Sequence, residues 1–515
     1  MLRRLREFLL ILISAILLVL PFHFGELWIL SFFAFVPYFC ALENKSAIDA
    51  AVLSFIFGFV FYVCLGYWLT LVNVIAFLVM AAYLSLYFAA FGMAAASFQK
   101  SARSILFIPA FWVVMEYLRG WILSGIPWAL LAHSQWKNIP FIQIADVTGV
   151  WGVSFFVMMV NFILFRLLSA VRSREKGSIA FLLGVLGAVL ILVMVYGTIT
   201  LRSRDAFYKS PKEKARLRVS VIQGNIPQDQ KWNAKIKGII FEKYKRLTLM
   251  AAVEKSDLIV WPETSFPGYI EDEPILASQL RSLVRQSRTD VLVGAPTLGD
   301  IEKGLRFYNS AILYGPDGEE KKRYHKVHLV PFGEFVPFQP LFGFIRNFFP
   351  IGHFSAGSEK TLFILESRYQ KIPIKARFST LICYEDIFPG LVRDFCKGGA
   401  DFLINMTNDA WFGKTTAPYQ HAQASVFRAV ENRVNVVRAT NTGYSCFISP
   451  EGRILARVED DGREIFVTGH KGHDLILRRT PSFYTRFGDV FMLFVVFLCF
   501  LAYRERAKHQ TYSRV

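Results

Sequence analysis

FSTLICYE, residues 378–385, is an apolar run that predicts a β-strand and ends on a cysteine followed by an acidic side chain. Two further motifs lie upstream in the chain. WPE (261–263) follows the apolar run 258–260, and HKVHLVPFGE (325–334) carries a lysine at its second position. The three motifs supply a thiol, a carboxylate and an ammonium, at Cys383, Glu263 and Lys326. A nucleophilic cysteine with its own base and its own cation is the equipment for forming an acyl-enzyme.

Strand-like runs alternate with helical patterns on both sides of these motifs. Strands are predicted at 217–222, 258–260, 291–293, 310–313, 378–382 and 402–404, and helices at about 233–254 and 418–433. This interleaving predicts an α/β layered fold. In such folds the reacting residues cluster where strands end and loops begin, which is where Glu263 and Cys383 lie.

The composition divides the chain into two kinds of segment. Of the 515 residues, 54% are hydrophobic, which is too many for one soluble domain. Residues 7–200 and 487–503 are dominated by Leu, Phe, Val and Ile, whereas 203–480 has the mixed composition of a globular domain. We therefore predict seven transmembrane helices in 1–202 with an interfacial loop at about 123–147. A globular domain follows at 203–480, and a last transmembrane helix and tail lie in 481–515.

Eight apolar stretches approach the ~20 residues that a helix needs to cross a bilayer. The first follows three arginines and resembles a signal peptide, but no small-residue cleavage site comes after it, so a retained anchor is expected. The broken stretch 125–137 does not span; its tryptophans fit either an ordinary extracytoplasmic loop or a lipid-side rim of the active site. The predicted spans are 7–23, 26–42, 48–70, 73–97, 104–122, 149–168, 179–199 and 487–503.

Basic residues in the loops predict the orientation. By the positive-inside rule, both termini are cytoplasmic and the globular domain faces outward. Arg478, Arg479 and Arg486 oppose this assignment, but they adjoin a long domain whose export depends little on charge. The net charge of +18 forms no single basic stripe with interleaved aromatic residues, so nucleic-acid binding is not expected. The residues that share the cytoplasmic side are Arg3, Arg4, Arg6, Lys45, Lys100, Arg103, Arg172, Arg174, Lys176, Arg504, Arg506 and Lys508.

The cysteines fit a nucleophile better than a metal site. Three of the six lie in apolar spans, where they act as small hydrophobic residues. The other three, Cys383, Cys396 and Cys446, fall in the globular segment, so at least one has no partner for a disulfide within that domain. No CxxC or Cys/His cluster has metal-ligand spacing, and we predict neither a metal nor a cofactor.

In this order and spacing, the WPE, HKxHLVPFGE and CYE motifs resemble the carbon–nitrogen hydrolase (nitrilase) superfamily, which has a Glu-Lys-Cys triad. With its membrane portion, the chain resembles the apolipoprotein N-acyltransferase family, bacterial enzymes that add the third acyl chain to lipoproteins. AHSQ (132–135) departs from the Gly-Tyr-Ser-Gln-like stretch expected there. Further matching stretches are VIQGNIP (221–227), NMTNDAWFG (405–413), RATNTG (438–443), EYLRG (116–120) and GIPW (125–128).

The resemblance implies an αββα sandwich and a role for each motif residue. Cys383 is the nucleophile, Glu263 the general base and Lys326 the electrostatic partner. Glu334 and Glu385 match acidic positions near the triad, and surface carboxylates are the alternative. Tyr384 and Trp232 match aromatic residues at the acyl or headgroup entrance, with core packing as the alternative. The Phe-rich stretch 335–354 is either a mobile flap that contacts lipid or a packed loop.

The implied reaction is a two-step transfer in the bacterial cytoplasmic (inner) membrane, carried out by a monomer. Cys383 takes an acyl chain from a membrane phospholipid as a thioester, and the α-amine of a diacylated apolipoprotein then accepts it. Such alternating use of one nucleophile is ping-pong catalysis. Two alternatives remain open: a membrane-anchored amidase or nitrilase with the same triad, and a transporter with a regulatory outer domain.

Overall fold

The computed structural model describes residues 2–101, 103–209, 215–299, 306–337, 340, 343, 352–369, 373–477 and 480–512, without the side chains of 508–512. The chain forms two compact units. The first combines Met1–Ser210 with Ser482–Val515, and the second is Pro211–Pro481. Most of the Phe-rich stretch 335–354, together with Arg478 and Arg479, lies outside the described residues.

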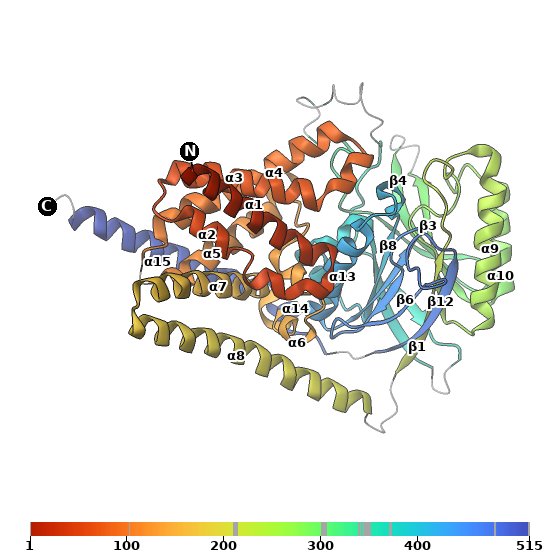
Figure 1. Cartoon of the computed structure of the whole chain (residues 1–515). Coiled ribbons are helices and arrows are strands. Elements are labelled where there is room, and N and C mark those ends of the chain that lie inside the picture. The colour runs from red at the N-terminus through yellow and green to blue at the C-terminus, as the bar shows by residue number, and fades with distance from the viewer. Residues whose placement is uncertain are drawn as a thin grey trace. The chain divides into compact units, whose positions relative to one another are not determined.

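The first unit is helical throughout its described length, as Figure 1 shows. Its longest helix, α8, has 34 residues. The elements are α1 (Leu2–His23), η1 (Gly25–Phe32), α2 (Val36–Leu42), α3 (Ala47–Leu65), η2 (Tyr67–Leu71), α4 (Val74–Phe98), α5 (Ser104–Arg119), η3 (Ile122–Ser124), η4 (Leu131–Gln135), α6 (Ile139–Ile142), α7 (Ala145–Ser173), α8 (Lys176–Lys209), α14 (Phe483–Phe487) and α15 (Val490–Tyr512).

Six helical segments among the described residues are long and apolar enough to cross a bilayer, which confirms the predicted multi-pass helical unit. The other two predicted spans fall on α5, which has only 16 residues, and on α15, which becomes charged from Arg504 onward. The count of eight therefore stays a prediction. The six segments are Leu2–His23, Gly25–Leu42, Ala47–Leu65, Val74–Phe98, Ala145–Ser173 and Lys176–Lys209.

Two predicted spans are broken in the structure. The stretch 26–42 consists of the 3-10 helix η1 and the short helix α2, which are separated at residues 33–35; Pro37 lies in the first turn of α2, where proline is tolerated. The stretch 48–70 is helical only to Leu65; Gly66 ends α3 and the chain continues as η2. The segment Gly25–Leu42 is nevertheless long and apolar enough to cross a bilayer, so only the span predicted at 48–70 was longer than its helix, which ends at Leu65.

The stretch predicted as an interfacial loop is packed inside the helical unit. Leu131, His133 and Gln135 of η4 are almost fully buried, and Leu131 N donates to Glu116 Oε1 at 2.6 Å. The indole of Trp136 lies directly against Gly25, where a Cβ atom would clash with it. These contacts account for the local path of the loop; its role as a lipid-side rim stays a prediction.

The second unit consists of two six-stranded sheets with the same internal pattern. In each sheet three neighbouring strands are parallel, β1-β2-β3 in one and β7-β8-β9 in the other, and the remaining pairs are antiparallel. The first sheet is ordered β12 (Gly469–Ile476), β1 (Arg216–Gln223), β2 (Leu258–Val260), β3 (Asp290–Leu298), β4 (Phe307–Tyr314), β5 (Glu320–His325). The second is ordered β11 (Ile454–Arg457), β10 (Cys446–Ile448), β9 (Asn435–Thr440), β8 (Phe402–Thr407), β7 (Lys375–Ile382), β6 (Phe363–Glu366).

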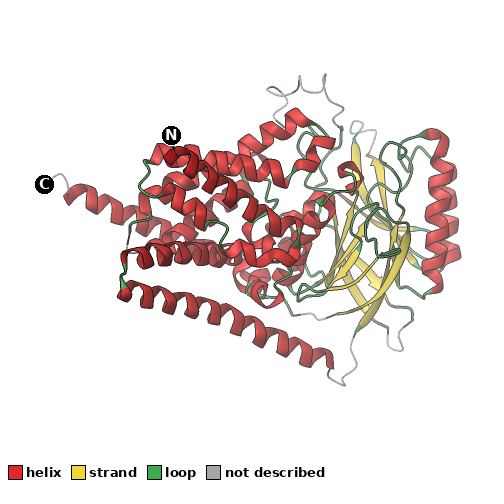
Figure 2. Cartoon of the chain, in the orientation of Figure 1, coloured by secondary structure: helices red, strands yellow, loops and turns green. Residues whose placement is uncertain are grey.

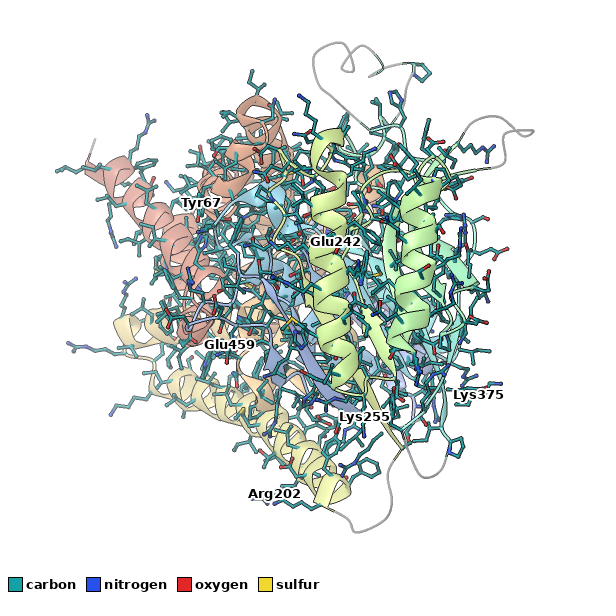
Figure 3. All side chains as sticks on the ribbon, turned by 90° about the vertical axis from the view of Figure 1, so that its right-hand side faces the viewer. Tyr67, Arg202, Glu242, Lys255, Lys375 and Glu459 are labelled. Carbon is teal, nitrogen blue, oxygen red and sulfur yellow. The ribbon has the colours of Figure 1, made fainter. Side chains whose placement is uncertain are left out.

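A pair of helices packs on each sheet, so the unit is an αββα sandwich, as the resemblance implied. Helices α9 (Lys237–Val253) and α10 (Pro274–Ser287) lie on the first sheet, whose strands are yellow in Figure 2. Figure 3 looks onto these helices, which run side by side. Helices α12 (Pro389–Lys397) and α13 (Ala417–Asn432) pack on the second sheet.

The hydrophobic core of the first layer follows from helix periodicity. In α10 the buried residues recur at three- and four-residue intervals and face the sheet. They meet the apolar faces of β1 to β4 around Trp261, whose indole donates to Thr248 at 2.9 Å and stacks on Tyr244. This core holds the end of β2, and thus Glu263, in place.

At Gly294 in β3, the backbone of Pro262 and Glu263 packs directly against the glycine. A Cβ at this position would lie 2.1 Å from Pro262 O, and the amides of Ser265 and Phe266 both donate to Gly294 O. We expect Gly294→Ala to destabilise the protein by about 1–3 kcal/mol through overpacking, seen as a lower apparent Tm in detergent. Gly238→Ala in α9 is the matched control, because nothing lies within 4 Å of a Cβ there. Equal melting of both variants would contradict this account.

Candidate active site

Cys383 is the first residue after β7 and has a left-handed backbone. Its φ is +53°, and η8 (Cys383–Ile387) begins with it. The carbonyl of Cys383 accepts a hydrogen bond of 3.0 Å from Asn405 Nδ2 on the neighbouring strand β8. Because non-glycine residues rarely adopt positive φ, the surrounding contacts must impose this turn. The result is a partly exposed thiol at the carboxyl end of a parallel strand.

Glu263, Lys326 and Glu334 form one charged group. Lys326 Nζ lies 3.9 Å from Glu263 Oε1 and 2.9 Å from Glu334 Oε2. Asn309 of β4 bridges the two carboxylates, since its Nδ2 donates to Glu263 Oε1 at 2.8 Å and to Glu334 Oε1 at 3.1 Å. All three charged side chains are largely withdrawn from solvent, which strengthens their interactions.

Glu385 is a buried acceptor for backbone donors from both sheets. Its Oε1 accepts from Tyr324 Oη, Val327 N and His328 N at 2.7, 2.8 and 3.0 Å, and its Oε2 accepts from Ile382 N at 2.7 Å. Burial raises the pKa of Glu385 to about 7, although Lys326 and these donors favour the charged form. The carboxylate therefore ties the segment after Lys326 to the turn that carries Cys383.

Burial and charge together decide the protonation states. Burial raises the pKa of Glu263, and burial and the neighbouring Glu263 raise the pKa of the Cys383 thiol. Burial alone would lower the pKa of Lys326, but Glu334 and Glu263 raise it above its ordinary value. These shifts favour the thiol form of Cys383 and the protonated form of Lys326, and they make the carboxylate of Glu263 more basic than an ordinary one. Such a carboxylate is suited to accept the thiol proton.

The structure brings the predicted triad together. Glu263 and Lys326 are in contact, and both interact electrostatically with Cys383. Tyr384 is half-buried and packs its ring on Phe388, with centroids 5.0 Å apart. Trp232 is 49% exposed, so core packing does not account for it. The entrance role of both aromatic residues stays a prediction.

Sequence reasoning missed several residues of this region. Asn309 lies in β4 just before the predicted strand 310–313, and the sequence there carries no sign of a polar bridge. Lys231 is buried near the triad and donates from Nζ to Glu263 O at 3.0 Å. Three site loops also contain non-glycine residues with positive φ that sequence alone does not show: Asn225 (+50°), Thr264 (+44°) and Phe332 (+60°).

A second buried charge network lies directly after Cys383 in the sequence and in space. His421 Nε2 is 2.8 Å from Asp386 Oδ1, and its Nδ1 is 3.2 Å from Asp409 Oδ1. Arg438 Nη1 donates to Asp386 Oδ2 at 2.9 Å and to Ser425 Oγ at 2.6 Å. The network joins η8, α13, β9 and the loop after β8, and so fixes the surroundings of the nucleophile. Asp409 and Arg438 lie in motifs quoted for the family resemblance, but nothing in the sequence pairs them.

Within the described residues, no group of three or more His, Cys, Asp or Glu side chains could hold a metal ion. The chemistry available here is that of a thiol, a carboxylate and an ammonium. That set supports nucleophilic attack on a carbonyl carbon.

The His421 network predicts a loss of stability at alkaline pH. Burial alone would lower the pKa of His421, but Asp386 and Asp409 raise it from 6.5 to about 9. The stabilisation is thus fully present below pH 6.5 and is lost as pH rises through about 9. We expect the apparent Tm of the wild type to fall across this window. His421→Gln should melt lower at neutral pH and lack the slope, whereas exposed His353→Gln should keep it. Parallel curves for wild type and His421→Gln would refute this role.

Comparison with known proteins places these features in a family. The family described as apolipoprotein N-acyltransferase N-terminal domain matches residues 14–163, and the carbon-nitrogen hydrolase family matches residues 218–469. An amidase from Nesterenkonia sp. AN1 covers 52% of this chain and 92% of its own, with 20% identity and a TM-score of 0.38.

Relatives of similar length carry both parts. An apolipoprotein N-acyltransferase from Geobacter metallireducens is 36% identical over 98% of this chain and 96% of its own. The enzyme of that name from Haemophilus influenzae is 32% identical over 87% of this chain and 86% of its own. The chain belongs to the apolipoprotein N-acyltransferase family.

Proposed function

We propose that this protein transfers an acyl chain from a membrane phospholipid to the N-terminal α-amine of the diacylglyceryl-cysteine of apolipoproteins. The observation that carries the proposal is the buried contact of Lys326 with Glu263, beside a partly exposed Cys383, in a chain whose described residues include six helical segments long and apolar enough to cross a bilayer. The names of its relatives support lipoprotein N-acylation. The lipid donor follows from the membrane helices, because a bilayer supplies acyl esters to an enzyme that it holds.

The first half-reaction makes a thioester. Glu263 accepts the proton of the Cys383 thiol, and the sulfur attacks the carbonyl carbon of a phospholipid ester. Lys326 stabilises the oxyanion that forms on that carbonyl. The carbon–oxygen bond to the glycerol then breaks, the leaving oxygen takes the proton from Glu263, and lysophospholipid departs.

The second half-reaction passes the acyl group to nitrogen. The neutral α-amine attacks the thioester carbon, and Glu263 accepts one of the amine protons. When the tetrahedral intermediate collapses, the carbon–sulfur bond breaks and an amide remains. Cys383 recovers its proton from Glu263, so the enzyme returns to its starting state. One nucleophile serving two substrates in turn gives ping-pong kinetics.

The neighbouring residues have positioning roles in this scheme. Glu334 holds Lys326 Nζ at 2.9 Å, and Asn309 holds Glu263 at 2.8 Å. Glu385 orients the backbone after Lys326 without reaching the reacting atoms. In this proposal, exposed Trp232 and half-buried Tyr384 line the entrance for the acyl chain or headgroup. Glu263 and Lys326 are nearly inaccessible to solvent, which strengthens their electrostatic interactions at the site.

The thioester is the first measurement that tests the proposal. Incubating the detergent-solubilised wild type with a defined phospholipid should add an acyl mass to the peptide that contains Cys383. Hydroxylamine should remove that mass, and a diacylated lipopeptide should receive it. Cys383→Ala should fold but gain no acyl mass, while the control Cys64→Ala should behave as wild type. Acyl labelling that survives in Cys383→Ala would refute the assignment.

Glu263→Gln removes the proposed general base, and Lys326→Met removes the proposed cation. Each should slow thioester formation by at least about 10²-fold, a magnitude typical for loss of an oxyanion donor or a positioned base. Turnover of small amides without release of lysophospholipid would instead identify a membrane-tethered hydrolase with the same triad.

The proposed setting is the bacterial cytoplasmic membrane, with a monomer whose termini are cytoplasmic and whose αββα unit faces outward. An impermeant maleimide should label Lys375→Cys on this unit in intact spheroplasts, because that side chain is well exposed (Figure 3). Arg174→Cys, between α7 and α8, should react only after permeabilisation, and the chain without added cysteines gives the background. The reverse labelling pattern would overturn the orientation.

A further inference from the structure

The charged group at the site has fewer cations than its chemistry requires. Lys326 is shared between two carboxylates, with Nζ 2.9 Å from Glu334 and 3.9 Å from Glu263. One ammonium therefore faces two negative charges before any reaction begins. Transferring the thiol proton to Glu263 moves one of these negative charges to the Cys383 sulfur, and attack on the ester moves it to the oxyanion of the acyl carbon. Throughout, the group keeps one negative charge more than Lys326 offsets. In a buried site such an excess charge is costly unless a cation offsets it.

Lys231 is a buried cation that the triad leaves unused. It is only 5% exposed, although lysine is almost never buried unless paired. Its Nζ donates to the main-chain oxygen of Glu263 at 3.0 Å, and this is its one hydrogen bond among the residues described. An ammonium has three donors, so two remain available to other groups. The charge of Lys231 acts on both Glu263 and Cys383.

The loop that carries Lys231 is held rigidly against the carboxyl ends of strands in the second sheet. Asn225 N donates to Asn441 O at 2.8 Å, and Ile226 N donates to Asn441 Oδ1 at 2.9 Å. Further along the loop, Asn408 Nδ2 donates to Gln228 Oε1 at 2.8 Å. These bonds fix the loop before any substrate arrives, which is the preorganisation that electrostatic catalysis needs.

We propose that Lys231 is a second catalytic ammonium of this site, which stabilises the negative charge on Cys383 sulfur and on the tetrahedral intermediate formed there. The inference rests on the proposed role of Cys383 as nucleophile. Lys326 and Lys231 then act together: Lys326 contacts the carboxylates and contributes to the oxyanion, and Lys231 offers its two remaining donors to the developing charge. Burial lowers the pKa of Lys231 to about 8, against the influence of Glu263 and Cys383, so the group is charged at neutral pH.

Three substitutions distinguish charge from packing and from hydrogen bonding. Lys231→Arg keeps the charge, Lys231→Gln keeps a neutral donor for Glu263 O, and Lys231→Met keeps only the aliphatic stem. Lys235→Met is the matched control, because Lys235 is an exposed lysine four residues further along. The apparent Tm of each variant in detergent reports whether it folds.

The first readout is the rate of Cys383 alkylation by iodoacetamide, measured on the Cys383 peptide from about pH 7 to about pH 10. Below about pH 8, Lys231→Met and Lys231→Gln should react about tenfold more slowly than wild type, the effect of raising the thiol pKa by about one unit. Lys231→Arg and Lys235→Met should stay within about threefold of wild type. Glu263, Lys326, Asp409 and Thr407 also act on this thiol, and all four are unchanged in these variants.

The second readout is thioester formation with phospholipid, where Lys231→Met and Lys231→Gln should lose about 10²-fold in rate and Lys231→Arg should recover part of it. Wild-type behaviour of Lys231→Gln in the alkylation assay would overturn the proposal, because Lys231 would then act only as a donor to Glu263 O. If Lys231→Met fails to fold, the comparison of Lys231→Gln with Lys231→Arg decides. Should wild type form no thioester with lipid, the proposed function fails, yet alkylation still tests Lys231.

Discussion

The carboxylate of Glu385 is the link on which the geometry of this site depends. It accepts four hydrogen bonds, three from Tyr324 and the two amides that follow Lys326, and one from the amide that precedes Cys383. The ammonium comes from a loop of the first sheet and the thiol from a turn of the second. Without a common acceptor, these two segments would have no fixed distance between them. A buried carboxylate whose oxygens are all hydrogen-bonded is held rigidly, and it therefore also fixes the segments that carry Lys326 and Cys383.

The two sheets repeat one pattern of parallel and antiparallel strands, and each contributes strand ends to the site. Glu263 follows β2 of the first sheet, and Cys383 follows β7 of the second. The loop with Lys231 follows β1, the strand that corresponds to β7 in the repeated order. The site is thus composite: neither sheet alone carries a base, a cation and a nucleophile. Face-to-face packing of the sheets is a precondition for the chemistry, because it sets the separation of the two sets of strand ends.

Short apolar runs predicted the α/β layered fold well, whereas the αββα arrangement was implied by the family resemblance, and the long apolar stretches were harder to divide. The run 258–260 coincides with β2, and the helix predicted at 418–433 is α13, Ala417–Asn432. The local spacing of apolar residues is sufficient to predict these two elements, because it shows whether one or both faces are buried. The span predicted at 48–70 ended early, since uniform hydrophobicity carries no signal for a break at Gly66. Lys231 lies in a loop without periodicity, and its contact with Glu263, 32 residues away, has no trace in the sequence.

Every loop that forms the site includes a residue whose backbone is in the left-handed region: Asn225, Thr264, Phe332 and Cys383 itself. Each such non-glycine residue costs about 1–3 kcal/mol, so these loops carry local backbone strain. Glycine at these positions would relieve the strain, and it would also free the side chains to move. In a heat-adapted relative, these loop positions would therefore be less open to stabilising substitution than the core. Added stability has to come from the sheets and helices, because relaxing the loops would let the side chains of the site move out of position.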